Sequence, residues 1–110
     1  MLGVLIAMDS AYVSKIIADD LVANPDFNNS HGVDVEACVV TPRRLKFENS
    51  LHDGAFIDLW LVLEECPGHY EGYLVAFDDE RCEFGLAVHG KKHPVFIAYY
   101  GSFTETLSAM

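Results

Sequence analysis

The sequence predicts an α+β fold: an antiparallel β-sheet meander of about five strands, with an N-terminal helix and a short C-terminal helix. Three observations support this prediction. Apolar residues recur with helical spacing near the N-terminus, short apolar runs separated by polar turns fill the rest of the chain, and a capping motif precedes the last residues. A chain of 110 residues is the size of one domain, so we expect a single α+β domain spanning 1–110.

The N-terminal helix is predicted from its two ends and its apolar face. Asp9 and Ser10 are suitable N-caps, because their side-chain oxygens accept hydrogen bonds from the first free N–H groups. Pro25 disfavours helical backbone at the residue before it, so the helix should end near Ala23. The apolar residues 2–7 should form a short strand or lead into the helix. The apolar face consists of Val13, Ile16, Ile17 and Leu21.

The strands are predicted from apolar and β-branched runs that end at turn residues. The first run ends at Thr41-Pro42, and a later break is Cys66-Pro67-Gly68-His69. Short strands joined by short polar turns pair with their neighbours in the chain, which predicts the antiparallel meander. The predicted strands are 33–40, 44–48, 55–64, 72–78, 83–89 and 95–100.

The C-terminal helix is predicted by a capping box. Ser102 is followed three residues later by Glu105, so each side chain can bond the other residue's backbone N–H. Phe103 and Leu107 are four residues apart and lie on one helical face, so we expect them to dock on the sheet.

The net charge of −10 limits the classes of partner. A surface this acidic repels phosphate backbones and anionic lipid, which disfavours nucleic acids and membranes and favours a basic protein partner. Solubility alone is the simpler explanation. Nine acids and no Lys or Arg occur between Phe47 and Glu80. The acids expected to attract such a partner are Asp78, Asp79 and Glu80.

The strand at 55–64 has two apolar faces, so both faces of the sheet need cover. One face carries Ile57, Leu59, Leu61 and Leu63. The other mixes aromatics with acids, and three alternatives are open for its cover: a second subunit in a homodimer, the chain's own helices, or a ligand. Asp58 would act as an acid, a base or an interface ion-pair partner if it were buried there. The residues predicted for this ligand or interface face are Phe56, Asp58, Trp60, Val62 and Tyr73.

No catalytic or metal-binding motif is recognisable. His89 and His93 have the spacing of a helical ligand pair, but Gly90 and Pro94 predict a turn between them. We therefore expect no metal, no cofactor and no assigned catalytic residue. The three cysteines form no C-x-x-C pair, which favours a reducing compartment, and we expect a cytoplasmic protein.

The C-terminal part resembles the ends of small bacterial toxin-immunity proteins. The likeness rests on three stretches, 84–87, 94–97 and 102–107, in which a last strand runs into a short helix opened by Ser102-Phe103. The resemblance implies a toxin-neutralising α+β domain and transfers no functional residues.

Together these observations predict a non-enzymatic acidic interaction protein, homodimeric, of the toxin-neutralising or another protein-binding type. The alternative is a small-molecule-binding protein or a small enzyme. Its pocket would lie between sheet and helix around Asp58 and Trp60.

Overall fold

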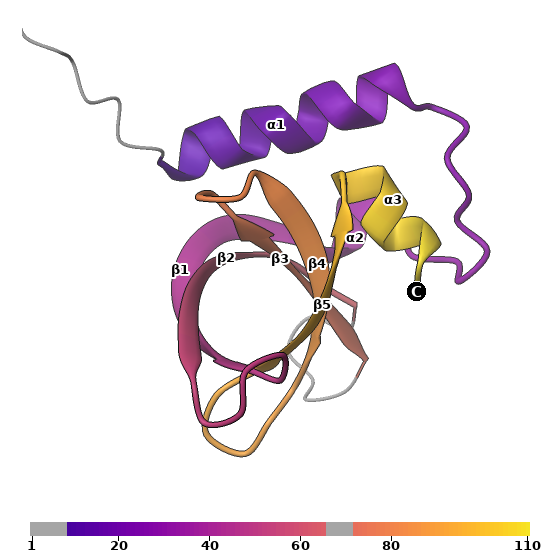
Figure 1. The fold of residues 1–110 in the computed structure, drawn as a ribbon. Coiled ribbons are helices and arrows are strands. Elements are labelled where there is room, and N and C mark those ends of the chain that lie inside the picture. Colours follow the sequence, from indigo (N-terminus) through magenta and orange to yellow (C-terminus); the bar gives the residue numbers. More distant parts are fainter. Residues whose placement is uncertain (1–8, 66–71) are drawn as a thin grey trace, which may run out of the picture.

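The computed structural model describes residues 9–65 and 72–110, and within them five strands form a closed barrel with helices packed on its outside (Figure 1). Each strand pairs antiparallel with the next one in the chain, which confirms the predicted meander and the α+β fold. The elements are α1 (Ser10–Ala23), α2 (Val35–Cys38), β1 (Val39–Asn49), β2 (Phe56–Glu64), β3 (Tyr73–Asp78), β4 (Glu83–Val88), β5 (Val95–Gly101) and α3 (Phe103–Ser108).

The barrel closes where the end of β1 meets the start of β5. With an odd number of antiparallel strands the first and last run in the same direction, so this seam is parallel. Glu48 lies opposite Val95 and Asn49 opposite Phe96. The backbone N–H of Glu48 donates to the carbonyl oxygen of Pro94 at 2.8 Å. The seam is therefore short compared with the length of β1.

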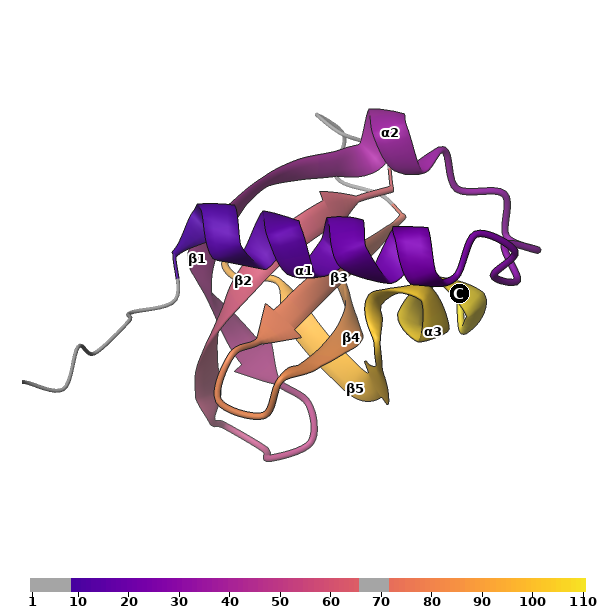
Figure 2. The same ribbon diagram turned by 90° about the horizontal axis from the view of Figure 1, so that it is seen from above.

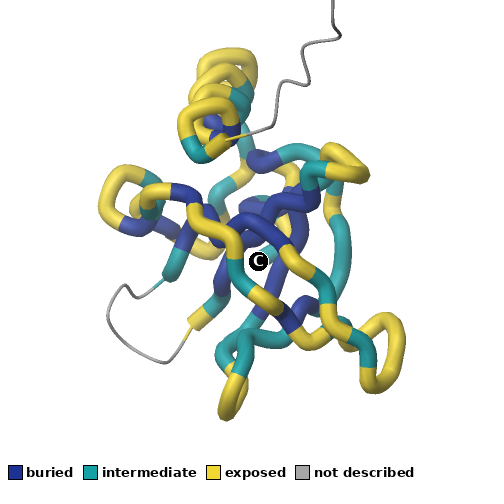
Figure 3. The backbone as a smooth tube through the Cα atoms, turned by 90° about the vertical axis from the view of Figure 1, so that its left-hand side faces the viewer, coloured by how far each residue is buried: buried dark blue, intermediate teal, exposed yellow. Residues whose placement is uncertain are grey.

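The barrel wall is buried on both sides, and Figure 3 shows that the buried segments lie mainly in the strands. This explains why the sequence of β2 has two apolar faces: one faces the barrel interior and the other faces the chain's own helices. The inner core is Phe47, Leu59, Leu61, Leu74, Ala76, Ala87 and Phe96. The outer core includes Val13, Ile17, Trp60, Val62, Leu63, Val75, Phe77, Phe84, Leu86, Phe103 and Leu107.

Helix α1 forms as predicted and lies across the outside of the barrel, with α3 beside its C-terminal end (Figure 2). The Asp9 carboxylate accepts from the backbone N–H of Tyr12 at 2.9 Å, and the helix ends at Ala23. Val13 and Ile17 are buried against the barrel. The local signals in the sequence therefore determine both ends and the packing face of this helix.

Helix α3 has the predicted capping box, in which Ser102 and Glu105 each accept from the other's backbone N–H at 3.2 Å. Phe103 and Leu107 are fully buried, as expected. The backbone N–H of Thr104 also donates to the Asp20 carboxylate at 2.8 Å, which ties α3 to α1.

The prediction of separate strands at 33–40 and 44–48 is wrong. Residues Val35–Cys38 form a single helical turn, α2, because the Asp34 carboxylate caps it by accepting from Ala37 N–H at 3.3 Å. Strand β1 then continues through Pro42, where the pairing register with β2 shifts. A proline is tolerated there because a bulge does not need its missing N–H.

Further register shifts between described strands break the predicted alternation of inward and outward side chains. In β2 the register shifts between Leu61 and Leu63, so Leu63 packs outward with Val62 instead of inward with Leu61. In β5 both Phe96 and Tyr99 belong to the inner cluster, because the β4–β5 register also shifts. The alternation predicted from sequence is therefore correct only between bulges.

The predicted lead-in at 2–7 and the break at 66–69 lie outside the described residues. Among the residues that are described, no helix combines the length and apolar composition needed to cross a bilayer.

Candidate functional site

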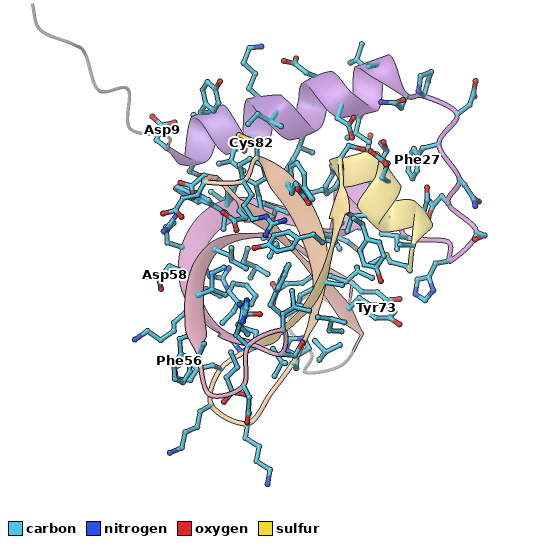
Figure 4. All side chains as sticks on the ribbon, viewed as in Figure 1. Asp9, Phe27, Phe56, Asp58, Tyr73 and Cys82 are labelled. Carbon is cyan, nitrogen blue, oxygen red and sulfur yellow. The ribbon has the colours of Figure 1, made fainter. Side chains whose placement is uncertain are left out.

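The residues of the predicted ligand or interface face differ in burial. Trp60 is only 8 % exposed, Val62 is fully buried, and both belong to the core between the barrel and the helices. Phe56 is 52 % exposed and Asp58 is exposed, whereas Tyr73 is half-buried on another strand. Figure 4 shows Phe56 and Asp58 on the outer side of the barrel, far from Tyr73. The exposed and the buried members of the predicted face therefore lie in different surroundings within the described residues.

The predicted acidic turn carries one buried and one ion-paired carboxylate. Asp78 is 6 % exposed and accepts from Tyr99 Oη at 2.5 Å and from the backbone N–H groups of Glu80 and Arg81. Burial and the bonded Asp78 carboxylate raise the pKa of the Tyr99 hydroxyl above its ordinary value. Asp79 binds Arg44 at 3.0 Å. The carboxylates of Asp78 and Asp79 therefore stabilise the turn, and Glu80 is the exposed member of the predicted set.

The structure forms a different cavity at the mouth of the barrel, between the inner side of β1 and the β4–β5 turn. Its volume is about 440 Å³, which is within the range of small-molecule sites. Leucines of the barrel interior form its floor, and charged and imidazole side chains surround the opening. The lining residues are Arg43, Leu45, Leu61, Glu64, Leu74, His89, Gly90, Lys91, Lys92, His93 and Pro94.

The barrel mouth gathers three basic side chains that form no ion pair within the described residues, beside one acid, Glu64. Of the seven Lys and Arg residues in the sequence, all of which are described, three are ion-paired: Lys15, Arg44 and Arg81. A fourth, Lys46, has its ammonium 5.6 Å from the centre of the Phe56 ring. The other three have no ion pair within the described residues, and all three line the cavity: Arg43, Lys91 and Lys92.

Local backbone features place each charged group at this opening. Arg43 precedes Leu45 and Phe47 at intervals of two along β1, so the alternation that points the last two inward also points Arg43 toward the mouth. The bulge in β2 turns Glu64 to the same opening. Lys91 and Lys92 project from the turn after Gly90, where a Cβ atom would collide with the carbonyl oxygen of His93.

Sequence reasoning missed this site. Arg43, Lys91 and Lys92 are visible as bases in an acidic chain, but they are almost 50 residues apart. The short parallel seam between β1 and β5 brings them together. Glu64 points to the opening because of a bulge that the alternation of β2 does not indicate.

A second polar cluster holds the long α1–α2 connection against the barrel. The His31 ring contacts the Glu65 carboxylate, whose other oxygen accepts from the backbone N–H of Tyr73 at 2.7 Å. Burial alone would raise the pKa of Glu65, but the Tyr73 N–H and His31 together lower it below its ordinary value.

The lowered pKa of Glu65 predicts a loss of stability in acid. The unfolded chain binds this proton more tightly than the folded chain, so the stabilisation is complete above the unfolded pKa, near 4.5, and is lost as the pH falls through the lower folded value. We expect the urea midpoint of the native protein to fall more between pH 6 and pH 3 than that of Glu65→Gln. If the urea midpoints of the two proteins fell equally over this pH range, Glu65 would not be the cause of the loss in acid.

The described residues contain no group of three or more His, Cys, Asp or Glu side chains arranged to hold a metal ion. No protein-family model matches the sequence, and comparisons with curated proteins and with solved structures give no significant match.

Proposed function

We propose that this protein is a non-enzymatic binding protein that takes an anionic ligand, bearing a carboxylate or phosphate, at the barrel mouth. The observation that carries the proposal is the convergence of Arg43, Lys91 and Lys92 on one cavity without carboxylate partners among the described residues. The leucine floor of the cavity would accept an apolar portion of the same ligand.

The local charge at the barrel mouth supports this proposal, although the protein as a whole is strongly acidic. With a net charge of −10, an anion is repelled at long range, and only a local concentration of cations can hold it. A hydrogen bond to a charged group contributes about 1.5–3 kcal/mol, roughly twice as much as a neutral one. At about 0.1 M salt, charges separated by more than about 10 Å are largely screened from one another, so the short-range contacts determine affinity at ordinary ionic strength.

Two predictions from the sequence remain proposals beside this one. A basic protein partner, such as a toxin, would contact exposed acids, of which Glu80 is one. A homodimer would use exposed apolar side chains such as Phe56, because Trp60 and Val62 are covered within the chain. The cations of the barrel mouth, which form no ion pair within the described part of the chain, favour an anionic ligand over both.

The test is binding of citrate and inorganic phosphate, measured by calorimetry at low salt on the wild type and on matched variants. We expect Arg43→Gln and the double change Lys91→Gln with Lys92→Gln each to weaken binding by about tenfold, equivalent to about 1.4 kcal/mol. Glu64→Gln should strengthen binding severalfold, because it removes the acid that lines the cavity.

Lys15→Gln is the control, because Lys15 lies on α1 in an exposed ion pair with Asp19. It changes the net charge as Arg43→Gln does, away from the cavity. Equal weakening by the two variants would show that binding follows net charge alone and would overturn the proposed site. Absence of binding by the wild type would overturn it as well.

A further inference from the structure

We propose that the anion at the barrel mouth belongs to an extended acidic peptide, which adds as a strand to the free edge of β1. This inference rests on the proposed function and names its ligand class. Addition of a strand to an exposed sheet edge is a common mode of peptide recognition, in which backbone hydrogen bonds give affinity and side-chain sites give specificity.

Strand β1 has a free edge because its pairing with β5 is so short. Only Glu48 and Asn49 lie opposite residues of β5. The N–H of Glu48 points to that side, since it donates to Pro94, whereas the N–H of Asn49 donates to Ala55 on the β2 side. Backbone groups alternate between the two edges of a strand, so the N–H and C=O of Arg44 and Lys46 also point to the β5 side.

These backbone groups have no hydrogen-bond partner on that side within the described residues. The free stretch is limited at one end by Pro42, whose carbonyl oxygen accepts from Ser10 Oγ at 2.7 Å, and at the other by Glu48. Arg44 and Lys46 together offer two donors and two acceptors. An extended segment of about five residues, roughly 17 Å long, matches this stretch.

The free edge runs beside the cavity. Arg43 and Leu45 line the cavity with side chains on the inner face of β1. Alternate side chains of an added strand would point to the same inner side, toward Arg43, Lys91 and Lys92. The cavity therefore selects acids at every second position.

The side chains on the outer face of β1 already contact other residues of the chain. Arg44 binds Asp79, and Lys46 lies over Phe56. The remaining positions of the added strand would therefore face solvent. Charged residues on an edge strand also oppose pairing with another copy of the same basic edge. An acidic strand is favoured because its charge is opposite to that of the basic side chains on this edge.

The first probe is a peptide of about six residues, acetylated and amidated at its ends, in which glutamate alternates with threonine. Its binding is compared with that of citrate. Binding is followed by calorimetry and by amide hydrogen exchange. We expect the peptide to bind about tenfold or more tightly than citrate, because backbone bonds add to the charge contacts. We also expect the amides of Arg44 and Lys46 to become protected from exchange when it binds.

Two methylated peptides test the backbone bonds directly. One carries N-methyl groups on its threonines and the other on its glutamates, and both keep the charge. Consecutive N–H groups of a strand point to opposite edges, so only one of the two sets can donate to β1. Strand addition predicts that one methylated peptide loses about tenfold or more in affinity while the other binds like the parent. Loss at threonine indicates antiparallel addition, and loss at glutamate indicates parallel addition.

Other outcomes separate this inference from the proposed function. If both methylated peptides bind as the parent does, or if Arg44 and Lys46 stay unprotected, the peptide is held by charge alone and strand addition is wrong. If citrate binds with the expected variant pattern and the peptide binds no better, a small anion is the ligand. If neither binds, both proposals fail.

Discussion

Trp60→Asp is expected to leave the protein largely unfolded at 25 °C. Trp60 is 8 % exposed and packs between the barrel and the helices, with the Arg44 guanidinium 5.5 Å from its ring centre. Removing a buried indole costs about 3–5 kcal/mol, and an uncompensated carboxylate adds several more. Arg44 already binds Asp79, so it would offset the new charge only in part. Because small domains have about 5–15 kcal/mol of stability, circular dichroism and urea titration should show loss of the native state.

Phe56→Asp is the matched control for this prediction. Phe56 lies on the same strand but is 52 % exposed, with the His93 ring 5.3 Å away. The same change of charge should alter stability by only about 1 kcal/mol there. If Trp60→Asp instead gave folded monomers from a wild-type dimer, as light scattering would show, the aromatic face would be a subunit interface and the helix would not be its cover.

Gly85→Ala is expected to destabilise the protein by about 3 kcal/mol or more, although it adds a single methyl group. Gly85 lies in β4, where a Cβ atom would stand 2.6 Å from Cζ of Phe96 and still closer to the carbonyl oxygen of Ala98. Phe96 is fully buried inside the barrel, so its ring has no free space to enter. The urea midpoint should therefore fall sharply.

The double variant Gly85→Ala with Phe96→Leu separates the two collisions. The smaller leucine relieves the contact with the ring, so the double variant should lose less stability than the two single changes together. It should not reach the stability of Phe96→Leu alone, because the Ala98 carbonyl belongs to the backbone of the paired strand. A Gly85→Ala protein with the wild-type midpoint would contradict this close approach.

The parts of the fold that the sequence predicts well depend on residues close together in the chain. Asp9 caps the N–H of Tyr12, and Ser102 and Glu105 cap each other, all across three residues. The error at 33–40 arose because a single helical turn capped by Asp34 is too short to show helical periodicity.

The candidate site depends on contacts between residues far apart in the chain. Alternation in β2 indicates two apolar faces but not what covers them, since a barrel interior, a helix and a second subunit all favour the same side chains. The bulge that turns Glu64 to the barrel mouth depends on pairing with β3, which the sequence of β2 does not specify.

The sequence by itself determined the helix ends, most of the strand positions and the acidic character of the protein, because these follow from local hydrogen bonding, periodicity and composition. The tertiary structure decided that the meander closes into a barrel, that the helices bury Trp60, and that Arg43 meets Lys91 and Lys92 at one cavity. The physical reason is the pairing of the end of β1 with the start of β5, which joins residues almost 50 positions apart and brings the two basic segments to the same opening.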